Sequence, residues 1–291
     1  MTQTATLIAR PGTLEPALVE SLRNAWRGGD ALWLAPDEAA EFAMPLVPAN
    51  RWDVWQSLQD RRVDLAVQPS ENRRKSVLLA DMDSTMIEQE CIDELAEMAG
   101  VGAAVRDITA RAMNGDLDFE AALTERVALL RGMAEEIIDE VLRTRITHMP
   151  GGRILLATMK AQGAYAALVS GGFTAFTERV GAALGFDENR ANRLIIEDGF
   201  LTGEVAHPIL GRDAKVNALD EIVARLGRTE QDVIAVGDGA NDLGMLGRAG
   251  MGVALHAKPS VAARCALRIQ HGDLSALLYL QGIGKTEFSP R

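Results

Sequence analysis

Val77-Leu-Leu-Ala-Asp81-Met-Asp83-Ser-Thr is the stretch of the sequence that decides the fold. Its first four residues are the short apolar run expected of a buried strand, and two aspartates follow almost directly. Two carboxylates this close at a strand end repel each other, and burial penalises each charge further. A divalent cation is the simplest compensation. Ser84, Thr85 and the backbone amides beyond the strand could hold a phosphate nearby. The stretch therefore predicts an aspartate that attacks phosphorus and a second aspartate beside it that moves protons.

The same pattern of an apolar run that ends in small or polar residues recurs along the chain. Further runs lie at 164–169, 233–236 and 252–255, and helical stretches at 214–226 and 242–249 separate them. Continuous apolar strands that alternate with helices indicate a parallel sheet covered on both faces. The expected fold class is α/β, with a Rossmann-like, doubly wound parallel sheet at the core.

A change in composition predicts a domain boundary near residue 73. All four tryptophans of the 291-residue chain lie in its first quarter, and the polar stretch 68–75 separates them from a part that is poor in aromatic residues. We expect residues 1–73 to form a small α/β unit with a helix near 15–26. Its expected strands are 5–9, 31–35 and 63–67.

The second domain is expected to span residues 74–291 and to contain an inserted cap. From about 88 to 148, leucine, isoleucine, valine and methionine recur at helical spacing, without a strand between them. A helical block inserted after the first strand is expected to cover the carboxyl end of that strand. Residues 192–205 predict a β-hairpin around the turn at Asp198-Gly199.

Composition excludes several classes of protein. The formal net charge of −11 argues against nucleic-acid binding, which requires clustered lysine and arginine. Charged residues interrupt each apolar stretch before it reaches membrane-spanning length, so we expect neither a signal peptide nor a membrane helix. Cys91 and Cys265 belong to no CxxC pair or metal-ligand cluster. Two such cysteines make a disulfide framework unexpected and favour a reducing cytoplasm, and Cys91 is interpreted as a small core residue.

Three further segments place polar groups at expected strand ends or helix starts. Ser170-Gly-Gly follows one run, Gly237-Asp238-Gly-Ala-Asn241-Asp242 follows another, and Lys215 opens a helix. Taken alone, each has an ordinary explanation as a helix cap, a turn residue or a solvated lysine. Because ligands of open α/β sheets bind at the carboxyl ends of the strands, we expect these segments to converge with Asp81 in one crevice.

Together, the four segments resemble the four motifs of the haloacid dehalogenase superfamily over about residues 77–280. Stretches 88–96, 112–119 and 119–130, with 191–194 in the hairpin, are similar to the cap of its phosphoserine phosphatase branch. Residues 1–73 resemble the N-terminal extension, described as ACT-like, of some bacterial members.

The resemblance implies roles for the catalytic and metal-binding positions. Asp81 would be the nucleophile that becomes an aspartyl phosphate, and Asp83 would protonate the leaving oxygen and then activate water. The implied cofactor is Mg²⁺, held by the Asp81 side chain, the Asp83 backbone carbonyl and Asp238, with Asp242 in support. Oxygen ligands of this kind are the ones that Mg²⁺ prefers.

It also implies how a substrate would be held. Ser170, the Gly171 amide and Lys215 would bind phosphoryl oxygens, and Asn241 would position substrate or water. These positions carry the polar groups that phosphoryl transfer needs, because that reaction depends mainly on positioning and neutralisation of charge.

From the cap, Glu90 would bind a substrate ammonium group and Arg126 a substrate carboxylate. Without the family pattern, both residues would be interpreted as part of the solvent-exposed face of a helix. The resemblance therefore implies a cytoplasmic Mg²⁺-dependent phosphomonoesterase that acts on a small molecule, O-phospho-L-serine, in the last step of serine biosynthesis.

Two alternatives stay open. The same scaffold could transfer the phosphoryl group to an alcohol acceptor such as homoserine, instead of to water. An ACT-like unit at residues 1–73 could sense an amino acid or could join two chains into a homodimer.

Overall fold

The structure, a computed structural model, describes residues 2–113 and 116–289. Its strands are β1 (Gln3–Ile8), β2 (Leu32–Ala35), β3 (Ala39–Met44), β4 (Asp64–Pro69), β5 (Val77–Ala80), β6 (Tyr165–Phe173), β7 (Glu188–Asn192), β8 (Leu194–Glu197), β9 (Phe200–Val205), β10 (Val233–Gly237), β11 (Met251–Leu255) and β12 (Leu267–Ile269).

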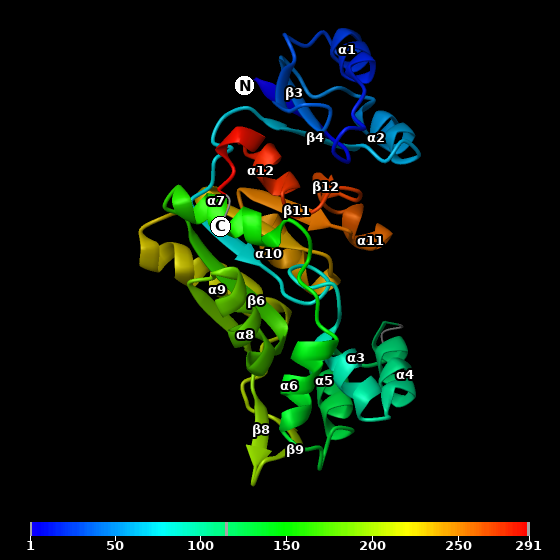
Figure 1. The fold of residues 1–291 in the computed structure, drawn as a ribbon, viewed down its shortest axis with the longest axis vertical. Coiled ribbons are helices and arrows are strands. Elements are labelled where there is room, and N and C mark those ends of the chain that lie inside the picture. Colours follow the sequence, from blue (N-terminus) through cyan, green and yellow to red (C-terminus); the bar gives the residue numbers. More distant parts are fainter. Residues whose placement is uncertain (1, 114–115, 290–291) are drawn as a thin grey trace. The chain divides into compact units, whose positions relative to one another are not determined.

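Helices connect these strands (Figure 1). The α-helices are α1 (Pro16–Ala25), α2 (Arg51–Gln59), α3 (Cys91–Met98), α4 (Gly102–Met113), α5 (Phe119–Ala128), α6 (Glu136–Thr144), α7 (Gly152–Ala161), α8 (Thr174–Leu184), α9 (Arg212–Leu226), α10 (Leu243–Arg248), α11 (Pro259–Ala262) and α12 (Ala276–Leu280). The 3-10 turns are η1 (Glu230–Asp232), η2 (Ala240–Asp242) and η3 (Lys285–Glu287).

The main sheet has the strand order β12-β11-β10-β5-β6-β7. Its β10–β11, β11–β12 and β6–β7 pairs are parallel. Strands after β5 extend the sheet first to one side, through β6 and β7, and later to the other, through β10 to β12. The order therefore reverses between β5 and β10, which is where open α/β sheets bind their ligands. The expected fold class is confirmed.

Contacts divide the chain into two compact units. The first contains Met1–Leu79, Pro150–Ala166 and Leu219–Arg291. The second contains Ala80–Met149 and Ala167–Ala218. The domain limits expected from composition, and the ACT-like character of residues 1–73, stay predictions.

In the first unit, the N-terminal residues form an antiparallel sheet of order β2-β3-β1-β4. With α1 after β1 and α2 after β3, the element order is βαββαβ, a split βαβ arrangement. Alternate residues such as Leu7, Phe42 and Leu65 share one core with Val19 of α1 and Leu58 of α2, so both helices cover the same face.

Neither β3 nor α2 was predicted from the sequence. The β3 sequence Ala-Ala-Glu-Phe-Ala-Met has few residues of high β propensity, and its strand state comes from pairing with β1. The α2 sequence carries Trp52, Val54 and Trp55 on a largely polar helix, so its periodicity is weak.

The other face of this sheet carries buried polar side chains instead of an apolar stripe. Asp64 has no exposed surface, and its carboxylate accepts the amides of Gln270 at 2.7 Å, His271 at 3.1 Å and Gly272 at 2.7 Å. Gln68 Nε2 donates to the carbonyl of Leu280 at 2.7 Å. The sheet is thus joined on this face to the chain segment that follows β12.

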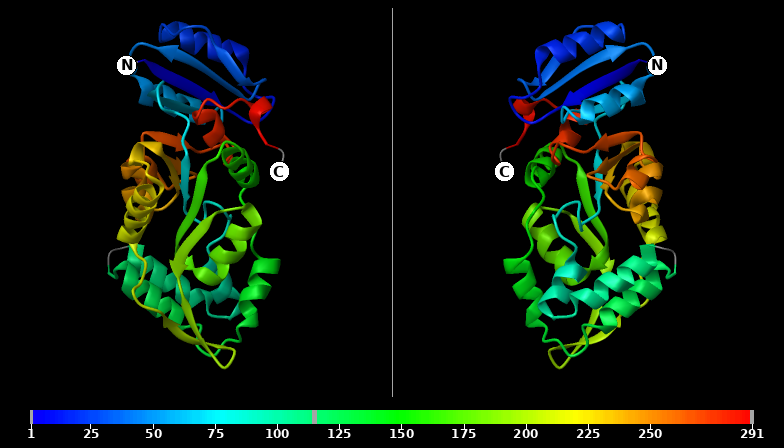
Figure 2. Two further views of the ribbon diagram at one scale, coloured as in Figure 1. Left: turned by 90° about the vertical axis from the view of Figure 1, so that its left-hand side faces the viewer. Right: turned by 90° about the vertical axis from the view of Figure 1, so that its right-hand side faces the viewer.

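The second unit contains the cap helices α3 to α6, which lie grouped together in Figure 1. The β8–β9 hairpin turns at Asp198 and Gly199, both with positive φ, and lies beside α5 (Figure 2). Leu201 exchanges backbone hydrogen bonds with Gly132 and Met133, each 2.8 Å long. Of the cap stretch 112–119, Asn114 and Gly115 lie outside the described residues.

Two short strands of the main sheet also escaped the sequence analysis. The β7 sequence Glu-Asn-Arg-Ala-Asn is polar, and β12 has only three residues, so neither shows an apolar run. Within the described residues, no helix is long and apolar enough to cross a membrane.

We predict that Asp64→Asn lowers the free energy of unfolding by about 1–3 kcal/mol, because an amide nitrogen would replace one oxygen that accepts backbone amides in a buried place. Urea unfolding measures this change. The control Asp60→Asn makes the same substitution at an exposed site and should change stability by less than about 0.5 kcal/mol. Equal effects of the two substitutions would show that the Asp64 contacts do not stabilise the fold.

Candidate active site

The site begins with a buried ion pair at the end of β5. Asp81 is the first residue after the strand and is 5% exposed, while Lys215 in the first turn of α9 is 2% exposed. The Lys215 Nζ lies 2.7 Å from Asp81 Oδ1, which also accepts the Met82 amide at 2.8 Å. A buried carboxylate is costly unless it is paired, so the lysine offsets much of the cost of placing Asp81 here.

Asp83 is held in a different environment. Its Oδ1 accepts the amide of Cys91, the first residue of α3, at 3.0 Å, and its Oδ2 faces the Ser170 hydroxyl at 3.4 Å. Burial raises the pKa of Asp83, although hydrogen bonds from Cys91 and the charge of Lys215 act in the opposite direction. Asp83 therefore keeps a proton more readily than an aspartate in water, which suits a proton donor.

The Ser170-Gly-Gly segment does not lie between a strand and a helix, as the sequence analysis expected. Strand β6 continues to Phe173, and α8 begins only at Thr174. Pairing with β7 shifts register between Val169 and Phe173, so the segment forms an irregularity within the strand. The reason is local: the Ser170 hydroxyl accepts the Gly172 amide at 2.9 Å, which folds the backbone inside the strand.

Gly172 has no room for a side chain. A Cβ atom placed there would lie 2.6 Å from Asp83 Oδ2 and 3.2 Å from Ser170 Oγ. Glycine at this position therefore lets the backbone approach the carboxylate of Asp83 closely.

Asn192 is a positioning residue to which the sequence analysis gave no role. Its Nδ2 donates to the carbonyl of Gly171 at 2.9 Å, and its Oδ1 accepts the amide of Leu210 at 2.7 Å. It is 2% exposed and ends β7. Asn192 thus ties the Ser170 segment to the loop before α9, which carries Lys215. The resemblance of residues 191–194 to the family pattern was the signal in the sequence that pointed to this position.

Strand β10 leads into a second group of acidic residues. Asp238 follows the strand directly, and Asn241 and Asp242 lie in η2. Asp242 is fully buried, and its Oδ2 accepts the Gly239 amide at 2.9 Å. At Gly237, a Cβ atom would lie 2.4 Å from the Asp242 carboxylate carbon, so glycine leaves the room in which this side chain packs.

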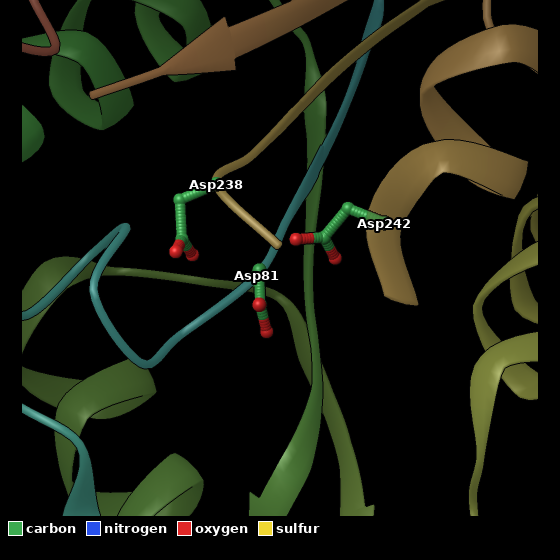
Figure 3. Close-up of side chains that lie close together, drawn as sticks. All are labelled: Asp81, Asp238 and Asp242. Carbon is green, nitrogen blue, oxygen red and sulfur yellow. The ribbon is translucent and has the colours of Figure 1, made fainter. Parts of the chain in front are cut away.

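Figure 3 shows the side chains of Asp81, Asp238 and Asp242 close together. Each offers an oxygen, and these oxygens lie within 4.8 Å of one another. Three crowded, mostly buried carboxylates fit a hard cation, which takes oxygen ligands and neutralises their repulsion. The arrangement could hold a metal ion. Asp242 was expected only to support the metal ion, but like Asp238 it offers one possible ligand oxygen.

The two cap residues singled out in the sequence lie on α3 and α5. Glu90 is the exposed N-cap of α3, and its Oε1 accepts the Ser84 hydroxyl at 2.8 Å. Arg126 is partly buried, and its Nε donates to the carbonyl of Ala122 at 3.1 Å. Burial lowers the pKa of Arg126, while the charges of Asp93, Glu90 and Asp83 raise it. The arginine is therefore within electrostatic reach of both Glu90 and Asp83.

Similarities to known proteins bear on this site. Residues 78–247 match the family described as haloacid dehalogenase-like hydrolase. A phosphoserine phosphatase from Polaromonas sp. is 45% identical over 205 residues, which cover 69% of this chain and 87% of that protein. A phosphoserine phosphatase from Archaeoglobus fulgidus is 43% identical over 198 residues, or 67% of this chain. That match spans 57% of the Archaeoglobus protein, so the chain corresponds to little more than half of that relative.

Among solved structures, a HAD family hydrolase, t0658, from Salmonella enterica subsp. enterica serovar Typhi is similar over nearly the whole chain. The TM-score is 0.87 at 30% sequence identity, and the match covers 96% of this chain and 98% of that one. The similarity therefore includes the N-terminal sheet as well as the main sheet.

We predict that Mg²⁺ raises the melting temperature by a few degrees, because a ligand at ~100 times its Kd stabilises by about 2.7 kcal/mol. Asp242→Asn should abolish most of this shift, since it removes one of the crowded carboxylates. Without metal, the same variant should melt no lower than the wild type if repulsion is relieved. Asp198→Asn, at the exposed hairpin turn, is the control that should keep the full shift. A metal-dependent shift that survives in Asp242→Asn would place the cation elsewhere.

Proposed function

Because the chain belongs to the haloacid dehalogenase-like hydrolase family, we propose that it hydrolyses O-phospho-L-serine to L-serine and phosphate with the help of Mg²⁺. The observation that carries the proposal is the division of labour between two aspartates two residues apart. Asp81 is charge-paired with Lys215 at 2.7 Å, whereas burial raises the pKa of Asp83. One carboxylate is thereby suited to attack and the other to carry a proton.

The proposed reaction has two steps. An oxygen of Asp81 bonds to phosphorus as the bond from phosphorus to the serine oxygen breaks, and Asp83 gives its proton to that oxygen. Water then attacks phosphorus in the aspartyl phosphate, Asp83 takes a proton from the water, and phosphate leaves with the carboxylate of Asp81 restored. Each step leaves Asp83 in the protonation state that the next step requires.

Other residues would hold the phosphoryl group. Ser170, the Gly171 amide and Lys215 supply donors and a positive charge, and Asn241 would orient substrate or water. A Mg²⁺ ion held by Asp81, Asp238, Asp242 and the Asp83 carbonyl would neutralise charge on the phosphoryl oxygens. Asn192 would act indirectly, because it fixes the backbone at Gly171.

The cap residues support an amino-acid ester as the substrate. The carboxylate of Glu90 matches an ammonium group, and the guanidinium fork of Arg126 matches a carboxylate. Phosphoserine carries both groups on the carbon next to its phosphate-bearing methylene. Relatives such as those from Polaromonas sp. and Archaeoglobus fulgidus bear the name phosphoserine phosphatase, which agrees with this assignment.

We predict Mg²⁺-dependent phosphate release that favours O-phospho-L-serine over its D enantiomer, phosphothreonine and a sugar phosphate. The measurement is kcat/KM for each ester, with and without Mg²⁺. Asp81→Asn, which removes the nucleophilic charge, should lower kcat by about 10³-fold or more. Even rates across the panel would contradict the assigned substrate. If homoserine diverts phosphate into O-phosphohomoserine, the enzyme is a phosphotransferase and hydrolysis is its side reaction.

We also predict that Gly172→Ala lowers kcat by about 10²-fold, because the new methyl group would push the Asp83 carboxylate away from the position in which it transfers protons. The measurement is kcat for phosphoserine. Gly247→Ala is the matched control, since a Cβ atom there has nothing within 4 Å. Activity of Gly172→Ala within twofold of the control would show that Asp83 does not need its observed position.

A further inference from the structure

Ser84 adopts an unusual backbone conformation beside the two catalytic candidates. Its φ is 56°, in the left-handed region that costs energy for a residue with a side chain and that asparagine, aspartate or glycine more commonly occupies. Such strain persists only where neighbouring contacts enforce it, and it often marks a functional segment.

Consecutive hydrogen bonds connect this part of the loop to the start of the first cap helix. Asp83 Oδ1 accepts the Cys91 amide at 3.0 Å, and the Ser84 amide donates to the carbonyl of Gln89 at 3.2 Å. The Ser84 hydroxyl donates to Glu90 Oε1 at 2.8 Å. Three hydrogen bonds thus join residues 83–84 to residues 89–91, and the one between two side chains ends on Glu90.

Glu90 occupies the N-cap position of α3, but its side chain makes no capping hydrogen bond to the helix. The hydroxyl of Ser84 therefore binds a carboxylate that does not cap the helix. Glutamate is long and exposed here, so without a fixed partner it would lose rotamer freedom each time it bound a ligand. A partner on the loop that carries Asp83 reduces this cost and sets the direction of the carboxylate.

We propose that Ser84 is a positioning residue that fixes the Glu90 carboxylate and thereby favours phosphate esters that carry an ammonium group. This inference rests on the proposed function, because it assigns Glu90 to the ammonium end of the substrate. In its left-handed backbone conformation, Ser84 donates its hydroxyl to Glu90 and its amide to the carbonyl of Gln89. Substrate selection by the cap is in this way built on the same short loop as the chemistry.

The test compares O-phospho-L-serine with 3-phosphonooxypropanoate, which has the same carbon chain, carboxylate and phosphate but no amine. The quantity measured is the ratio of kcat/KM for the two esters. Ser84→Ala removes the hydroxyl and keeps a side chain at positive φ. Ser84→Gly removes the hydroxyl and relieves the backbone, so that an effect common to both variants reports the lost hydrogen bond.

Both variants should lower this ratio by about 5- to 20-fold, mostly through a higher KM for phosphoserine, because the lost hydrogen bond is made to a charged group. In a Glu90→Gln background, Ser84→Ala should change the ratio by less than about twofold, since the two residues act through one contact. An unchanged ratio in Ser84→Ala and Ser84→Gly, or a full further loss in the Glu90→Gln background, would overturn the proposal.

The wild-type protein separates failure of this inference from failure of the proposed function. A wild type that does not prefer phosphoserine over the amine-free ester contradicts the assigned substrate, and with it the role of Ser84. A wild type that prefers phosphoserine, with both Ser84 variants retaining that preference, contradicts only the role of Ser84.

Discussion

Carboxylates are crowded at the ends of β5 and β10, and the surrounding residues offset their mutual repulsion. Asp81, Asp238 and Asp242 place oxygens within 4.8 Å of one another in a mostly buried place. Such charges persist only with compensation, and the chain provides it through the Lys215 ammonium group and backbone amides at 82 and 239. Gly172 and Gly237 leave room for neighbouring carboxylates, because side chains there would displace the carboxylates of Asp83 and Asp242.

Asp83 shows how a second aspartate of the same motif acquires a different character. It lies two residues beyond Asp81, yet its carboxylate accepts a hydrogen bond from the first amide of α3 and faces the Ser170 hydroxyl. Because α3 is the first helix of the cap, the proposed proton donor Asp83 and the proposed ammonium ligand Glu90 are both held by hydrogen bonds between residues 83–84 and 90–91. A change at the start of α3 is therefore expected to affect both proposed roles.

The N-terminal sheet is hydrogen-bonded to the segment after β12. One face packs on α1 and α2, and the other places Asp64 and Gln68 against backbone groups of residues 270–272 and 280. Tyr279 and Lys285 add hydrogen bonds to Glu38. Any ligand that altered this sheet would act first on those C-terminal contacts, which gives the sensor hypothesis a physical route within the first unit.

The sequence by itself determined the fold class and the position of acidic residues at the ends of two strands. Apolar runs that close with Asp81, Ser170 and Asp238 indicate parallel strands whose carboxyl ends meet, because the periodicity and the end residues are local features. The hairpin turn at Asp198-Gly199 was readable for the same reason.

Only the tertiary structure decided that Ser170 lies inside a strand, that Asn192 joins the Ser170 segment to the loop before α9, and that Asp64 binds the amides of residues 270–272. It also decided that Ser84 directs its hydroxyl to Glu90. These features depend on hydrogen bonds between segments or on side-chain directions set by the packed backbone. Neither leaves a periodic trace in the sequence, because a single polar residue looks the same whether it is solvated or bound to a distant amide.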